Sequence, residues 1–205
     1  MKTETLSGIF KNAGISVFTL KDAERLTGKD MKYSSLFLSR AVKNRKLVRI
    51  GRGRYCFLNT NVYEVASAII FPSYISLSAA FQLYGLTTQS QISVIDVITS
   101  VRHRPLEFGG YTIKFIATGK KHLFGFSKFK NENIIAASPE KAIVDAIYFG
   151  MPAEAYVYEA LSNGIKRGLI DRARLLEFAE KMSSKTTLKK IREIIKEVDN
   201  DNVKG

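Results

Sequence analysis

The sequence predicts an α+β fold in which helices and strands fall into separate blocks along the chain. Apolar residues recur at helical spacing through the first 44 residues and again from about residue 138 to the end. Short runs of alternating or β-branched residues lie between these blocks, within residues 46–58 and 94–137. Because 45% of the residues are hydrophobic and 25% are charged, the chain has enough apolar surface to form a buried core.

The first elements of the chain are predicted from periodicity and capping residues. Residues 3–13 form the first helix, and residues 15–18 are β-branched and aromatic, which indicates a short strand. A second helix follows over residues 20–26. Thr19 is placed to cap it, with Asp22 three residues later in the position that completes a capping box.

A third helix is predicted over residues 33–44, with one apolar and one polar face. We expect the inward stripe to consist of Leu36, Phe37, the stem of Arg40, Ala41 and Val42. The outward face then shows Lys32, Tyr33, Ser35, Ser39 and Lys43. Two helices joined by a short turn, the second basic on its outer face, are typical of a helix-turn-helix.

A strand pair follows the third helix. Residues 46–50 alternate between polar and apolar, residues 54–58 form the return strand, and Gly51-Arg52-Gly53 makes the turn between them. A β-hairpin in this position predicts a winged helix-turn-helix domain over residues 1–58. The polar stretch at residues 59–61 marks the predicted boundary to a second domain, residues 59–205.

Positive charge is concentrated in this first domain. Residues 1–60 carry 13 Lys and Arg against 4 Asp and Glu, which accounts for +9 of the net charge of +13. A local excess of this size attracts polyanions, and the helix-turn-helix pattern favours duplex DNA over RNA or a membrane. A winged helix that contacts another protein is the alternative. The predicted DNA-binding residues are Lys29, Lys32, Tyr33, Ser34, Ser35, Ser39, Arg40, Lys43, Arg49, Arg52 and Arg54.

The second predicted domain begins with helices and continues with strands. Helices are expected over residues 62–71 and 74–86, followed by strands at 94–101, 111–117 and 133–137. Gly109-Gly110 is expected to join the first two of these strands as a hairpin.

The last third of the second domain is predicted to be helical from about residue 138. The expected helices cover residues 140–149 after Ser138-Pro139, 153–163 ending at Gly164, 172–182 capped by Asp171, and a last helix to about residue 198. The last helix mixes lysine and arginine with glutamate. This mixture indicates a solvated face, with a secondary DNA contact as the alternative.

The composition also excludes several classes of protein. No run approaches the roughly 18 apolar residues that a membrane-spanning helix needs. The single cysteine, Cys56, excludes an internal disulfide, so we expect a protein of the reducing cytoplasm. One cysteine with His103 and His122 is too few ligands for a structural zinc site. We therefore expect no cofactor, no metal and no membrane partner.

Three motifs occur in order along the chain: Gly51-Arg52-Gly53-Arg54-Tyr55, then residues 74–80 with Tyr84-Gly85-Leu86, and then Ser-Pro-Glu-Lys-Ala-Ile-Val-Asp at residues 138–145. This ordered set resembles the AbiEi-type antitoxins of type IV toxin–antitoxin (abortive-infection) systems, and the resemblance spans nearly the whole chain. It implies a winged helix that binds operator DNA and represses its own operon. It also implies a C-terminal domain that opposes a nucleotidyltransferase-type toxin.

Two further hypotheses remain open from the residues alone. One is a winged-helix regulator that responds to a small molecule or to another protein, with no toxin partner. The other is a Mg²⁺-dependent nuclease, in which Glu140 and Lys141 would act with Asp96 and Glu107. An acid at a helix start also complements the helix dipole, so we expect no enzyme. The oligomeric state, monomer or homodimer, is left open because no heptad pattern decides it.

Overall fold

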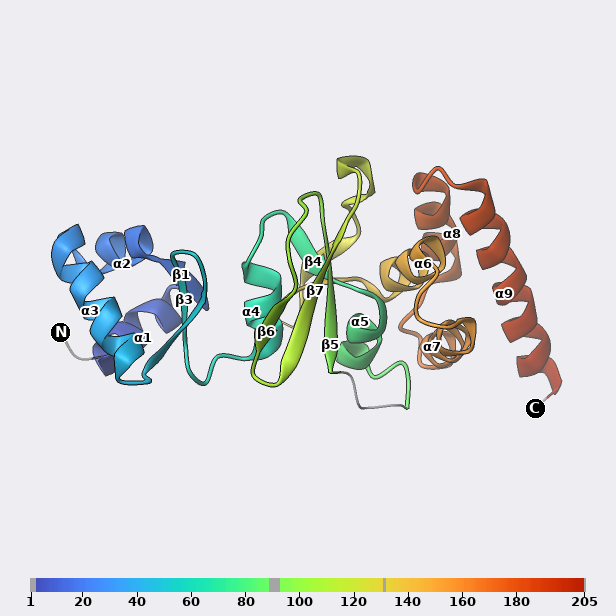
Figure 1. Cartoon of the computed structure of the whole chain (residues 1–205). Helices are drawn as coiled ribbons and strands as arrows, with labels where there is room; N and C mark the ends of the chain where they lie inside the picture. Colours follow the sequence, from blue (N-terminus) through green and yellow to red (C-terminus); the bar gives the residue numbers. More distant parts are fainter. Residues whose placement is uncertain (1–2, 89–92, 131, 205) are drawn as a thin grey trace.

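The computed structural model describes residues 3–88, 93–130 and 132–204. Within these residues the fold is mixed α+β, with nine α-helices and two sheets. A unit of three helices and a small sheet lies at one end, a larger sheet in the middle, and a group of helices at the other end (Figure 1). No helix among the described residues is long and apolar enough to cross a membrane.

The N-terminal unit, defined here as residues 3–57, contains three helices and three short strands. They are α1 (Thr3–Asn12), β1 (Val17–Thr19), α2 (Leu20–Thr27), α3 (Met31–Lys43), β2 (Leu47–Gly51) and β3 (Arg54–Phe57). The sheet order is β1-β3-β2, and both pairings are antiparallel. The predicted capping box is confirmed: the Thr19 hydroxyl accepts the Asp22 backbone N–H, and the Asp22 carboxylate accepts the Thr19 backbone N–H.

The core of this unit corrects the predicted apolar stripe of α3. Its buried members are Leu6, Phe10, Phe18, Ala23, Leu38, Ala41 and Leu47. Leu38 is 1% exposed, whereas Leu36, which the stripe included, is 51% exposed. The prediction followed the apolar residues, but the helix turns Ser34, Leu38 and Ala41 inward together at i, i+4 and i+7. The helix also begins earlier than predicted, because the Asp30 carboxylate accepts the Tyr33 N–H and caps it.

The second sheet has the strand order β6-β7-β5-β4-β9-β8. Its strands are β4 (Ser73–Ile75), β5 (Val94–Thr99), β6 (Leu106–Phe108), β7 (Tyr111–Ala117), β8 (Phe126–Lys128) and β9 (Ile135–Ala137). β5 is parallel to β7, and β4 is parallel to β9, while the other pairings are antiparallel. Helix α4 (Val62–Ala68) precedes β4 in the chain, α5 (Leu77–Tyr84) lies between β4 and β5, and the 3₁₀ turn η1 (Lys120–His122) lies between β7 and β8.

Two predictions for this region are wrong. Gly109 and Gly110, with φ of 59° and 82°, make the turn from β6 to β7 and not from β5 to β7. The chain leaves β5, adds the short strand β6 at the sheet edge and returns as β7, which is why β5 and β7 are parallel. The predicted helix over 74–86 is also divided, because residues Ser73–Ile75 pair with β5 and β9 before α5 begins at Leu77.

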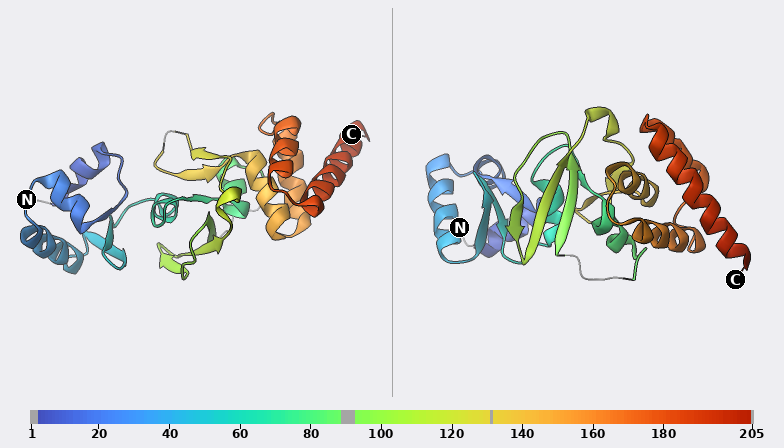
Figure 2. Two further views of the ribbon diagram at one scale, coloured as in Figure 1. Left: turned by 90° about the horizontal axis from the view of Figure 1, so that it is seen from above. Right: turned by 45° about the vertical axis from the view of Figure 1, so that its right-hand side comes forward.

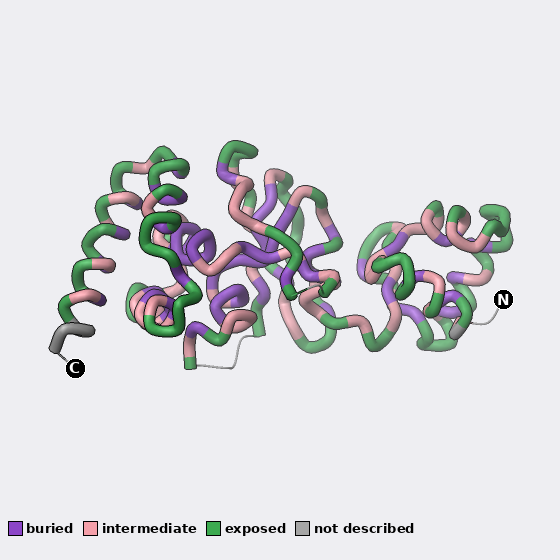
Figure 3. The backbone as a smooth tube through the Cα atoms, turned by 180° about the vertical axis from the view of Figure 1, so that it is seen from behind, coloured by how far each residue is buried: buried purple, intermediate pink, exposed green. Residues whose placement is uncertain are grey.

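The C-terminal helices pack around α6 (Pro139–Phe149), which contacts α5, α7 (Glu154–Lys166), α8 (Arg172–Lys181) and α9 (Lys185–Lys204). The caps predicted at Ser138 and Asp171 are present. Gly164 does not end its helix as predicted but lies buried inside α7, and α9 continues past residue 198 to Lys204. Figure 3 shows the buried segments concentrated in the larger sheet and in the helices that cover it.

The N-terminal unit meets the rest of the chain at α4. Ile50 and Cys56 belong to the same buried cluster as Val65 of α4 and Ile95 of β5. The Ser16 hydroxyl donates a 2.5 Å hydrogen bond to the Glu64 carboxylate. The two parts of the chain are therefore joined by apolar contacts as well as by the connecting segment.

Candidate nucleic-acid interface

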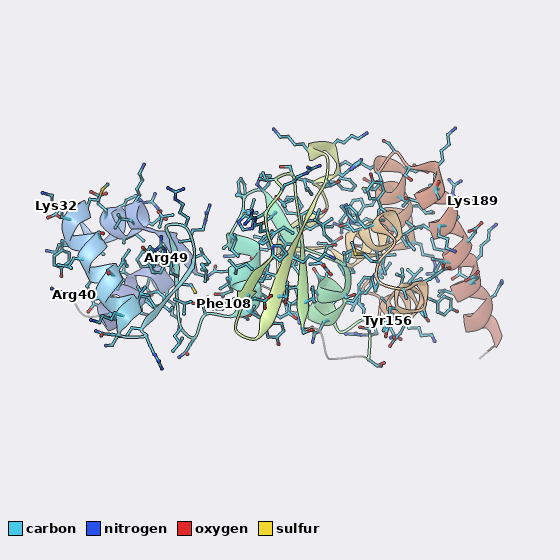
Figure 4. All side chains as sticks on the ribbon, viewed as in Figure 1. Lys32, Arg40, Arg49, Phe108, Tyr156 and Lys189 are labelled. Atoms are coloured by element: carbon cyan, nitrogen blue, oxygen red, sulfur yellow. The ribbon has the colours of Figure 1, made fainter. Side chains whose placement is uncertain are left out.

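The outer face of α3 carries most of the predicted DNA-binding residues. Lys32, Tyr33, Ser35, Ser39, Arg40 and Lys43 are all exposed, and so is Lys29 just before the helix. Lys32 and Arg40 lie on the side of α3 that faces away from the larger sheet (Figure 4). This face is cationic and open, so it is accessible to a large anionic partner.

The same face of α3 also exposes apolar side chains, which the helical pattern did not predict there. Leu36 lies between Lys32 and Arg40 at i+4 spacing, and Met31 is 48% exposed. The rings of Tyr33 and Phe37 stack with their centroids 6.4 Å apart. Together with Thr3, Arg40, Ala41, Asn44 and Lys46, residues Tyr33, Leu36 and Phe37 line a shallow hollow of about 340 Å³.

Ser34 is the one predicted contact that the structure contradicts. Its side chain is 3% exposed, and its hydroxyl donates to the Lys29 carbonyl at 3.5 Å. Ser34 therefore belongs to the inner face of α3, one helical turn before buried Leu38. The sequence contained the signal for this position, because Ser34, Leu38 and Ala41 share one helical stripe.

The β2–β3 hairpin supplies the other predicted cations. Arg49, Arg52 and Arg54 are exposed, and the Arg49 Nε–H donates to the Gly51 carbonyl at 3.3 Å. Gly53 has a φ of +70°, a backbone conformation that favours glycine, and this conformation closes the turn. The hairpin thus presents arginines at its tip with no side-chain bulk at Gly53.

Acidic groups are scarce over this surface. From Lys29 to Arg54 the chain carries nine Lys and Arg and one acid, Asp30. The Asp30 carboxylate is engaged by the N-terminus of α3, where it caps the helix. The positive field of α3 and the hairpin is therefore little offset by local carboxylates.

A second cluster of polar side chains lies buried between β4 and α6. The Lys141 ammonium donates to one carboxylate oxygen of Asp145. The hydroxyls of Tyr74 and Ser76 donate to the other oxygen at 3.1 and 2.8 Å. Burial lowers the pKa of Lys141, and the Asp145 carboxylate opposes that shift. All four side chains are buried, so the cluster joins the sheet to α6 and offers no surface to a substrate.

The acids of the nuclease hypothesis are not brought together. β7 lies between β5, which carries Asp96, and β6, which carries Glu107. The Glu140 carboxylate accepts from the Ser138 hydroxyl at 2.8 Å and from the Asp171 N–H at 3.3 Å. Over the described part of the chain, no three His, Cys, Asp or Glu residues are grouped as a metal site would require.

The cysteine and the two histidines are each packed or hydrogen-bonded within the protein. Cys56 is fully buried, and burial raises the pKa of its thiol to about 12. His103 is exposed, and its Nδ1 lies 2.6 Å from the Arg104 carbonyl. His122 is buried beside Tyr148, and burial lowers its pKa.

Comparison with known proteins does not show a family for this chain. No family model matches the chain, and no curated protein matches it. Among solved structures, the chain is similar to the crystal structure of the RV2827C protein from Mycobacterium tuberculosis. That alignment has 13% identity and a TM-score of 0.45, over 87% of this chain and 80% of the other. A similarity at this level carries no inference about function.

Proposed function

We propose that the N-terminal unit is a winged helix that binds duplex DNA, and that the protein is a sequence-specific transcriptional repressor. The observation that carries the proposal is the joint exposure of cations on α3 and on the β2–β3 hairpin of one small unit. In a winged helix, the helix equivalent to α3 enters the major groove, while a hairpin in the position of β2–β3 reaches the adjacent backbone or minor groove.

The residue types on α3 and on the β2–β3 hairpin fit these two kinds of contact. The lysines and arginines neutralise phosphates and release counterions, which gives affinity that falls steeply with salt. Ser35 and Ser39 are small exposed donors on α3 that can approach base edges closely. The exposed Leu36 beside them fits an apolar contact with a thymine methyl group.

We further propose that the repressor is the antitoxin of a type IV toxin–antitoxin pair and regulates its own operon. This part rests on the resemblance of the ordered motifs to AbiEi-type antitoxins. The partner would be a nucleotidyltransferase-type toxin, opposed by the part of the chain after residue 58. Co-expression tests it directly: the full chain should restore growth to cells that express the neighbouring gene product, and failure to do so would remove the antitoxin role.

DNA binding is tested by fluorescence anisotropy with a duplex from upstream of the protein's own gene that contains an inverted repeat. Wild type should bind it at least about tenfold more tightly than the double variant Arg52→Ala/Arg54→Ala, because two phosphate-neutralising charges are lost. The matched control Lys185→Ala/Lys189→Ala removes the same charge from exposed positions of α9. An equal loss of affinity in the two double variants, or binding that does not depend on salt, would contradict the proposal.

A further inference from the structure

Three separate segments leave the larger sheet at the same end of its strands. Ser73 at the start of β4 pairs with Thr99 at the end of β5, and Thr99 pairs with Ala117 at the end of β7. The Thr118 N–H donates to the Thr99 carbonyl at 2.8 Å. The turn before β4, the loop after β5 and the segment with η1 after β7 therefore leave the sheet together, at the upper edge in Figure 1.

This edge exposes cations around two apolar side chains. Phe71, two residues before Ser73, is 93% exposed, and Val101, two residues after Thr99, is 49% exposed. We define the basic edge as Phe71, Val101, Arg102, Arg104, Lys120 and Lys121, all of which are exposed. In the described part of the chain, none of its four cations has a carboxylate within ion-pair distance.

Acidic residues are sparse along the whole stretch. Between Asp96 and Glu132 the chain carries seven Lys and Arg and a single acid, Glu107. The Glu107 carboxylate accepts from the Thr112 hydroxyl at 2.7 Å within the β6–β7 pair. The small net charge of residues 61–150 hides this local excess, because Glu64, Asp96, Glu132 and Glu140 outside the stretch offset it in the sum.

The segments of the basic edge are held in place by hydrogen bonds. The Ser73 hydroxyl donates to the Ile70 carbonyl at 2.6 Å, and the Thr99 hydroxyl donates to the Pro72 carbonyl at 3.1 Å. The His103 ring packs edge-on against Phe115, with centroids 4.6 Å apart. An exposed phenylalanine on a fixed turn is ready to bind without further ordering cost.

We propose that the basic edge is a second DNA-contacting surface, which binds the duplex beyond the stretch contacted by the β2–β3 hairpin. The proposal rests on the proposed function. In Figure 1 and in the view from above in Figure 2, the hairpin and the loop after β5 lie on the same side of the molecule. Arg102, Arg104, Lys120 and Lys121 contact phosphates there, and Phe71 packs against sugars or inserts at a base step. A membrane surface fits less well, because two apolar side chains bury too little area for stable anchoring.

The test compares two duplexes by fluorescence anisotropy over a range of salt concentrations. One duplex contains the inverted repeat alone, and the other extends it by about one helical turn, roughly 10 base pairs, on each side. Wild type should bind the extended duplex about tenfold more tightly than the short one. The variant Arg102→Ala/Arg104→Ala/Lys120→Ala/Lys121→Ala should lose that gain. For the extended duplex, the slope of log K against log salt should be smaller in magnitude by about 3.6, while the affinity for the short duplex is unchanged.

A matched control removes four exposed cations of α7 and α9: Lys166→Ala/Lys189→Ala/Arg192→Ala/Lys196→Ala. Lys189 lies on α9, at the opposite end of the molecule from α3 (Figure 4), and this control should keep the full gain from the extended duplex. Phe71→Ser should lower the affinity for the extended duplex about threefold. The melting temperature should be unchanged, because the Phe71 side chain is 93% exposed.

The outcomes separate the two proposals. If neither duplex is bound, the proposed function fails. If both duplexes are bound with equal affinity, the basic edge does not contact DNA and the proposed function survives. The same conclusion follows if the two quadruple variants lose equal affinity for the extended duplex. Sedimentation of wild type, but not of the basic-edge variant, with phosphatidylserine vesicles, together with no gain from the extended duplex, would assign the surface to a membrane and overturn the inference.

Discussion

Ser34 and Ser35 are neighbours in α3 with the same side chain and opposite surroundings. Ser34 is buried, and its hydroxyl donates within the unit, whereas Ser35 is exposed beside Lys32 and Ser39. In the proposed complex, Ser35→Ala should weaken operator binding about fivefold, the equivalent of one hydrogen bond of about 1 kcal/mol. Ser34→Ala should leave the affinity within twofold. Anisotropy titrations of both variants check this, and a larger loss for Ser34→Ala would mean that α3 presents a different face to DNA.

Cys56 illustrates a buried thiol whose ionisation is linked to stability. Burial raises the pKa of the thiol from 9.0 to about 12, and a hydrogen bond with the Thr60 side chain opposes the shift. Between these two pH values the unfolded chain loses the thiol proton and the folded chain keeps it, so the stabilising contribution falls as pH rises.

The expected loss in the free energy of unfolding from pH 8 to pH 10 is about 1.4 kcal/mol for this group. Urea titrations of wild type and Cys56→Ala at the two pH values isolate the contribution of the thiol, because lysines and tyrosines titrate equally in both proteins. The pH-dependent fall should be smaller in Cys56→Ala by that amount. Parallel pH dependence in the two proteins would show that the thiol is not shielded from ionisation.

At the scale of elements, α7 shows why a glycine in a helical pattern has two possible meanings. The sequence predicted a helix end at Gly164, but the helix continues, and the glycine is there because Ile170 packs directly onto it. A Cβ built at Gly164 would lie 2.3 Å from the Cδ1 atom and 2.7 Å from the Cγ1 atom of Ile170. Only the fold brings the two residues together, so local sequence reasoning chose the commoner role of a helix end.

Gly164→Ala should therefore destabilise the protein by about 2 kcal/mol through overpacking, although alanine favours helix in isolation. The double variant Gly164→Ala/Ile170→Val removes the clashing Cδ1 atom and should recover about half of that loss. Thermal unfolding followed by circular dichroism measures both. If Gly164→Ala raises the melting temperature, helix propensity outweighs the contact with Ile170.

Elements defined by short-range signals were predicted well from the sequence, and elements defined by pairing were not. The capping box at Thr19, the helix after Ser138 and the glycine turn at Gly53 all depend on residues within a few positions of each other. The parallel pairing of β5 with β7 and the strand Ser73–Ile75 depend on partners far along the chain.

In the candidate interface, too, the residues located by short-range signals were predicted, and those brought together by long-range pairing were not. Its cations on α3 and the hairpin lie within 26 consecutive residues, so charge density alone located them. The basic edge was missed because Phe71, Arg102 and Lys120 are brought together only by the order and register of the strands. Leu36 was misplaced because an apolar side chain on a helix was assigned to the core, although nothing in the sequence requires that of a single leucine.

At the scale of the whole molecule, the N-terminal unit is not separated from the larger sheet by a linker alone. Ile50 and Cys56 of its hairpin share a buried cluster with Val65 of α4, and the same cluster continues to Ile95 and Ile113 of the larger sheet. A shared core couples the unfolding of the elements that contribute to it. We therefore expect the N-terminal unit and the larger sheet to unfold together, even though the sequence places a domain boundary at residue 58.

Leu38→Ala tests this coupling, because Leu38 lies in the core cluster of the N-terminal unit and is 1% exposed. The substitution should cost about 3 kcal/mol by creating a cavity. Native-state hydrogen exchange should show that cost in the slowest amides of β7 as well as in those of β3. Leu36→Ala, the same change at a 51% exposed position of the same helix, should alter neither set by more than about 0.5 kcal/mol. If Leu38→Ala lowers protection in β3 alone, the shared cluster does not couple the two parts. The N-terminal unit would then open independently while the larger sheet stays folded.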